Sequence, residues 1–163
     1  MYESGRQWVC KGALAAAGLA LSCGPVRAQD SLCQPGEPVV FACHTGSKTV
    51  SLCRPSALAK ELRYRFGTPA TVELAYPPAG KRLRAPFTVS TAPLAGGAIT
   101  SVTFRRGQYR YAVYSKVGRS DGAPLFEDGV IVSRRGKEVA KLVCDDGGEG
   151  FREKLDWLPV AER

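Results

Sequence analysis

The sequence has little of the chemistry on which enzymes and metal sites usually depend. It contains one histidine, His44, and one methionine in 163 residues, which leaves little scope for imidazole catalysis or soft-metal ligation. It has no Gly-x-Ser-x-Gly, His-Glu-x-x-His or phosphate-binding glycine motif, and no pair of carboxylates stands out. We therefore expect a protein that is not an enzyme and needs no cofactor.

The sequence also lacks an apolar run long enough to span a bilayer as a helix, which takes about 20 residues. The longest such run, Ala13–Ser22, follows the cations Arg6 and Lys11 and precedes the small residues of Val26-Arg27-Ala28. This three-part pattern predicts a cleaved secretory signal over residues 1–28.

Cys23 offers an alternative way of processing this segment. The residues Ala20-Leu21-Ser22-Cys23 resemble a lipoprotein processing box, although Ala20 stands where a branched apolar residue is usual. Cleavage after Ala28 is the preferred interpretation, and lipidation of Cys23 is the alternative. Without residues 1–28 the chain keeps 20 cations and 14 anions, a net charge of +6.

Export determines how the cysteines are interpreted. Cys33, Cys43, Cys53 and Cys144 remain after cleavage, and an even number in an exported chain predicts two disulfides. Three pairings are open. A hairpin over residues 39–53 brings the base of its second strand near Cys33, so we expect Cys33–Cys53 and Cys43–Cys144.

Alternation of apolar and polar residues is clearest from Leu62 to Tyr76, on both sides of a Gly/Pro turn. This pattern predicts a β-hairpin. With both apolar sets on one face, we expect Phe66 opposite Val72. Arg65 then lies opposite Glu73 on the solvent face.

The chain as a whole predicts eight to ten short strands and no long helix. Turn signals recur every 8–12 residues, which indicates an all-β antiparallel sandwich or barrel in a single domain over residues 29–163. The segments expected outside the strands are a helical turn at 55–61, loops at 77–86, 91–98 and 119–124, and a covering strand or short helix at 155–159.

Three groups invite a chemical interpretation that we consider weaker than a structural one. Cys43-His44 are neighbours on a strand, so their side chains point to opposite faces. The nine-residue gaps between cysteines do not match the close ligand pairs of structural zinc sites. The acidic run Asp145–Glu149 departs from an EF-hand loop and is better interpreted as a solvated turn than as a calcium site.

Three turns carry the cations that we consider candidates for binding. These candidate binding residues are Lys81, Arg82, Arg84, Arg105, Arg106, Arg110, Arg134, Arg135 and Lys137. Turns at one end of a sandwich lie together, so a joint patch could attract an anionic ligand. Cations also keep sheet edges soluble and unpaired, and this is the alternative interpretation.

The strand with Tyr109, Tyr111 and Tyr114 combines aromatic side chains with these cations, a composition that is common at binding surfaces. We expect Tyr109 and Tyr111 to fill the core. Tyr114 is then the tyrosine left as a candidate binding residue.

Three motifs carry a resemblance to known proteins: Cys-x9-Cys-x9-Cys, Leu62-Arg-Tyr-Arg-Phe-Gly-Thr-Pro-x-Thr-Val-Glu-Leu74, and Tyr109-Arg-Tyr-x-Val-Tyr114. Together they resemble a family of small exported proteobacterial β proteins. The resemblance implies a periplasmic setting and supplies no mechanism.

A second resemblance is to periplasmic inhibitors of C-type lysozyme, and it is carried by the segments Cys43–Gly46, Gly96–Ala98 and Tyr114–Gly118. The inhibitors' Ser-Gly-x-x-Tyr loop is missing, and a charge of +6 opposes binding to a basic lysozyme.

We therefore expect a periplasmic or secreted binding module that recognises another protein, as an inhibitor or an immunity protein does. The alternative is a binder of an envelope polyanion, such as lipopolysaccharide, that uses the cationic turns. Export argues against nucleic acid as the ligand.

Overall fold

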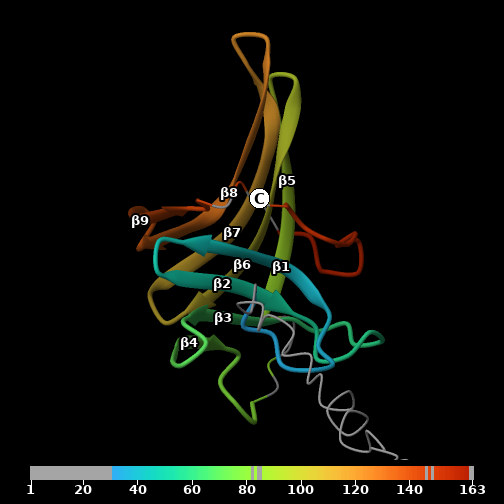
Figure 1. The fold of residues 1–163 in the computed structure, drawn as a ribbon, viewed down its shortest axis with the longest axis vertical. Coiled ribbons are helices and arrows are strands. Elements are labelled where there is room, and N and C mark those ends of the chain that lie inside the picture. The colour runs from blue at the N-terminus through green and yellow to red at the C-terminus, as the bar shows by residue number, and fades with distance from the viewer. Residues whose placement is uncertain (1–30, 82, 84–85, 146, 148, 162–163) are drawn as a thin grey trace, which may run out of the picture.

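The chain folds as two antiparallel sheets packed face to face (Figure 1). The computed structural model describes residues 31–161 except 82, 84–85, 146 and 148. Within this part the strands are β1 (Val39–Thr45), β2 (Lys48–Cys53), β3 (Arg63–Gly67), β4 (Val72–Tyr76), β5 (Phe87–Leu94), β6 (Gly97–Arg106), β7 (Tyr109–Ser120), β8 (Ala123–Arg134) and β9 (Lys137–Val143). The expected all-β sandwich is confirmed, and the expected signal segment and Cys23 lie outside the described residues.

Each sheet follows the order of the sequence, because every strand turns back beside its predecessor. The first sheet has the order β1-β2-β3-β4 and the second β5-β6-β7-β8-β9. In Figure 1 the strands of the first sheet run across the lower half of the second. The hairpins β5–β6 and β7–β8 continue beyond it as a projecting arm.

Two segments expected as loops are strands of this arm. Residues 91–98 continue β5 and β6 up to a turn at Ala95–Gly96, and residues 119–124 continue β7 and β8 around Asp121–Gly122. The small side chains hide the alternation on which the prediction depended. Gly97 also lets β6 approach β7, because a Cβ there would lie 1.9 Å from the carbonyl oxygen of Val117.

The core between the sheets is dominated by aromatic rings. Tyr64 of the first sheet packs on Phe104 of the second, with ring centroids 4.8 Å apart. Phe104 in turn stacks on Tyr76 and on Tyr111. Burying a side chain of this size stabilises a fold by about 1.5–3 kcal/mol, so this cluster is a major link between the two sheets.

The hairpin β3–β4 forms as expected, but the predicted register is wrong. Phe66 lies opposite Leu74, and Arg65 opposite Ala75. A bulge at Gly67, whose φ is 142°, shifts the pairing.

The predicted Arg65–Glu73 pair is therefore replaced by two others. Glu73 binds Lys48 of β2 at 2.8 Å. Arg65 is buried and binds Glu37, with Nη2–Oε1 at 3.1 Å, and Nη1 also donates to the carbonyl oxygen of Leu32. The segment before β1 covers this face of β3, so the face expected to meet solvent is enclosed.

Both expected disulfides are confirmed. Cys33–Cys53 and Cys43–Cys144 have Cα–Cα distances of 5.5 and 5.6 Å. Cys53 lies opposite Val39 at the base of the first hairpin, which brings it to the segment that carries Cys33. The second bond joins β1 to the residue after β9 and ties the two sheets together.

The C-terminal segment packs against the core and the edge of β5 without forming the expected covering strand or short helix. Leu155 and Leu158 are buried in the core. Val160 makes one parallel bridge to Val89 on the edge of β5. Residues 55–61 form bends and a turn and not the expected helical turn. None of the described residues belongs to a helix that could cross a membrane.

Candidate functional site

Two of the three cationic turns lie side by side at one end of the second sheet. The turn β6–β7 and the turn β8–β9 meet there because Tyr109 pairs with Arg134 at the shared end of β7 and β8. Arg135 connects them directly: its backbone N–H donates to the carbonyl oxygen of Gln108 at 3.3 Å, and its Nε donates to Gln108 Oε1 at 3.0 Å. We call this region the cationic end; its cations are Arg105, Arg106, Arg110, Arg134, Arg135 and Lys137.

A cavity of about 360 Å³ opens within the cationic end. Arg105 and Arg110 lie directly opposite each other on β6 and β7, and Ser133 lies opposite Arg110 on β8. Because cross-strand partners share a face, these three side chains converge on one side of the sheet. The lining residues are Arg105, Gly107, Gln108, Arg110, Ser133, Arg135 and Gly136.

The charge of the cationic end is not neutralised within the described part of the chain. The ion pairs there use Lys48, Arg54, Arg65, Lys141 and Arg152, and none involves a cation of this end. Glu138 lies opposite Ser133 on β9 but takes part in none of these pairs. Arg134 and Lys137 form a second pair of opposed cations. The field at this end therefore favours an anion.

The other face of the cationic end carries cations beside an aromatic ring. Arg134 lies over the ring of Tyr109, with its guanidinium carbon 5.6 Å from the ring centroid. Tyr109 is 38% exposed. Arg106 pairs with Tyr109 across the strands, so its side chain shares this face and does not line the cavity.

The tyrosines of β7 are placed differently from the sequence expectation. Tyr114 is 1% exposed, and its hydroxyl donates to Glu127 at 2.9 Å, so it is buried within its own sheet and is not available to a ligand at the cationic end. Burial, followed by this hydrogen bond and the charge of Glu127, raises the pKa of Tyr114. Tyr111 is half-buried and packs against the core, whereas the expectation that Tyr109 fills the core is wrong: Tyr109 is exposed and lies beside the cations.

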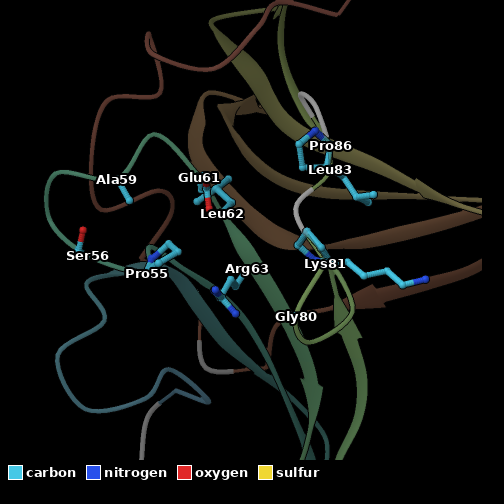
Figure 2. A pocket seen from close by; sticks show the side chains of 11 residues that line it. Pro55, Ser56, Ala59, Glu61, Leu62, Arg63, Gly80, Lys81, Leu83 and Pro86 are labelled. Atoms are coloured by element: carbon cyan, nitrogen blue, oxygen red, sulfur yellow. The ribbon is translucent and has the colours of Figure 1, made fainter.

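The third cationic turn borders a different cavity, of about 350 Å³ (Figure 2). Its walls include Pro55, Leu62 and Pro86, and its charged lining residues are Glu61, Arg63 and Lys81, which are exposed. In Figure 2 the side chain of Lys81 extends away from Pro55 and Arg63. Arg82 and Arg84 lie outside the described residues. This cavity does not gather charge as the cationic end does.

The groups that suggested catalysis or metal binding have structural partners. Cys43 is in a disulfide, and His44 Nδ1 lies 3.1 Å from the hydroxyl of Thr49. Asp145 accepts a hydrogen bond from the backbone N–H of Gly46 at 2.7 Å. In the described residues the one group with ligand-like spacing is Cys33, Glu37 and Cys53. Its sulfurs are bonded to each other, and its carboxylate binds Arg65.

Gln108 and Ser133 are site residues that the sequence analysis did not single out. Their place in the cavity follows from the register of β7 with β8 and from the turn contact with Arg135. Gln108 stands between two cationic runs in the sequence, and this position is the only signal that could have identified it.

No family model, curated protein or solved structure compared with this chain matches it.

Proposed function

We propose that the chain is an exported, non-enzymatic binding module whose cationic end binds an anionic component of the bacterial cell envelope, such as lipopolysaccharide. The observation that carries the proposal is the opposition of Arg105 and Arg110 across β6 and β7 beside a cavity that Arg135 also lines. Like charges directly opposite each other on a sheet are destabilising. A bound anion would remove that repulsion.

Export is supported by the two disulfides, because such bonds persist in oxidising compartments and are rare in the cytosol. The signal pattern in residues 1–28 supports it independently. Together they direct the proposal to ligands of the envelope and away from nucleic acid.

The test is binding of the oxidised mature protein to lipopolysaccharide over a range of salt concentrations. Affinity should fall as salt rises, since screening weakens attraction between exposed charges. The triple variant R105Q/R110Q/R135Q should lose at least about tenfold in affinity, because each charge-assisted hydrogen bond is worth about 1.5–3 kcal/mol.

A matched control removes three exposed cations from elsewhere. The variant K60Q/R119Q/K154Q has the same net charge as the test variant, and its sites lie outside the cationic end. Equal loss of affinity in both triple variants would show that net charge alone is responsible and would overturn the proposed site. Absence of salt-dependent binding to lipopolysaccharide would overturn the function.

One observation favours recognition of a protein as a second candidate function. On the arm, Val117 lies opposite Phe126, and Phe126 is 65% exposed. An exposed phenylalanine beside a valine could act as an anchor for a partner protein. Capture of one envelope protein in a salt-tolerant complex that F126S abolishes, and that the triple arginine variant retains, would support this candidate over the first.

A further inference from the structure

We infer that the cavity at the cationic end is a binding site for a phosphate monoester that is attached to a sugar. This inference rests on the proposed function and names the chemical group that the site recognises. A phosphorylated envelope lipid and a free sugar phosphate share this group, and the experiments below separate the two sources.

The lining of the cavity suits an oxyanion with several acceptor atoms. Three guanidinium groups, those of Arg105, Arg110 and Arg135, come from two strands and a turn, and Ser133, opposite Arg110, adds a hydroxyl. None of the lining residues is acidic. Guanidinium groups bind phosphate through two parallel N–H donors.

Two of the arginines are held by neighbours before any ligand arrives. Gln108 Oε1 accepts from Arg135 Nε at 3.0 Å, and Thr103 Oγ1 accepts from Arg110 Nη2 at 3.4 Å. Each of these contacts leaves other guanidinium donors available. Side chains held in this way lose less conformational freedom when a ligand binds.

The number of cations distinguishes phosphate from other anions. A phosphate monoester carries a charge of about −1.5 to −2 at pH 7, whereas a carboxylate or a sulfate ester carries −1. Three arginines around one cavity are therefore better matched by the monoester. At about 360 Å³ the cavity lies at the small end of the range of about 300–1,000 Å³ for small-molecule sites, so it has room for the sugar to which the phosphate is attached.

The first experiment is titration of the oxidised protein with glucosamine 6-phosphate, followed by calorimetry or by NMR. We expect saturable binding at least about fivefold tighter than that of glucosamine 6-sulfate, which has the same sugar and one charge less. Binding of the phosphate should weaken below about pH 6, where the monoester takes up its second proton, while binding of the sulfate should not change there. Equal affinity for the two esters would overturn the inference.

Single substitutions test the cavity itself. R110Q should weaken glucosamine 6-phosphate binding at least about tenfold, whereas R106Q, on the other face of the same end, should change it less than about twofold. R110K keeps the positive charge but lacks the planar guanidinium group with its two parallel N–H donors. It should weaken monoester binding and retain salt-dependent binding to lipopolysaccharide. Equal effects of R106Q and R110Q on monoester binding would overturn the inference that the cavity is the phosphate-binding site.

Vesicles identify the source of the phosphate and separate this inference from the proposed function. If a lipid headgroup occupies the phosphate-binding site, the protein should bind vesicles with diphosphorylated lipid A better than vesicles with its monophosphoryl form. If lipopolysaccharide binds and neither the sugar phosphate nor the phosphates of lipid A affect binding, the inference fails and the function stands. If glucosamine 6-phosphate binds and lipopolysaccharide does not, the inferred phosphate-binding site is supported and the proposed envelope function fails.

Discussion

Arg105 and Arg110 lie opposite each other on β6 and β7 because the other face of the same two strands requires it. The preceding pair in this register is Phe104 and Tyr111, whose rings stack with centroids 4.8 Å apart in the core. A shift of one residue would turn these aromatic side chains toward solvent. Aromatic packing therefore outweighs the repulsion of the arginines, and the cationic end is built at some cost in stability.

This relationship predicts that R110Q stabilises the protein while weakening anion binding. Relief of cross-strand repulsion should raise the free energy of unfolding by about 0.2–1 kcal/mol at low ionic strength, and the gain should shrink as salt is added. Urea denaturation at two salt concentrations measures the effect. R106Q is the control, since Arg106 lies opposite Tyr109, and a destabilised R110Q protein would contradict the prediction.

The ion pair between Glu37 and Arg65 should be important for stability. Both side chains are largely buried, at 8% and 10% exposure. E37Q leaves the Arg65 charge without its partner, so we expect a loss of about 3–5 kcal/mol. E73Q breaks the half-exposed pair with Lys48 and should cost less than about 1 kcal/mol. Similar losses in the two variants, measured by urea denaturation, would contradict this assignment.

The same carboxylate predicts an acid dependence of stability. Burial alone would raise the pKa of Glu37, but hydrogen bonds from Arg65 and from the backbone N–H of Gln34 lower it below the usual 4.5. The folded state therefore binds the proton less readily than the unfolded state does. The contribution of Glu37 is complete above that value and is lost as the pH falls through the folded pKa. E37Q should show a flatter decline in stability below about pH 4.5 than the parent protein, as followed by thermal unfolding at a series of pH values.

The two disulfides should differ in what they contribute. The bond Cys43–Cys144 joins residues 101 positions apart and Cys33–Cys53 joins residues 20 apart. In the chain-entropy model these loops are worth about 4.7 and about 3 kcal/mol. The variant C43A/C144A should therefore unfold at a lower urea concentration than C33A/C53A. Four free thiols in the native exported protein would contradict both bonds.

Tyr114 should matter for stability and not for binding. Y114F removes the hydroxyl that donates to Glu127, and a lost hydrogen bond to a charged group costs about 1.5–3 kcal/mol. Affinity for lipopolysaccharide should be unchanged, because this buried residue is not available to a ligand at the cationic end. R110Q should instead weaken binding, because Arg110 lines the cavity at the cationic end. Loss of binding in Y114F, with folding confirmed by circular dichroism, would contradict the placement of the site.

The amino-acid sequence was enough to predict the fold class, the strands with clear alternation and the pairing of the cysteines. These follow from local signals: a period of two in side-chain character, Gly-containing turns, and the reach of a hairpin whose base lies near Cys33. The arm was not predicted because residues 91–98 have mostly small side chains and show no alternation of apolar and polar residues. The register of β3–β4 was wrong because the bulge at Gly67 depends on backbone geometry.

Which charged side chains meet depends on three-dimensional packing that the sequence patterns did not predict. Arg65 was predicted to face solvent and is buried against Glu37, since a segment distant in sequence covers its face of β3. Arg105 and Arg110 share a cavity with Arg135 because β8 pairs with β7 and brings the second turn to the first. The sequence predicts only that these cations lie in or beside turns. Which turns adjoin depends on the pairing of β7 with β8 and on its register, and neither follows from the turn signals alone.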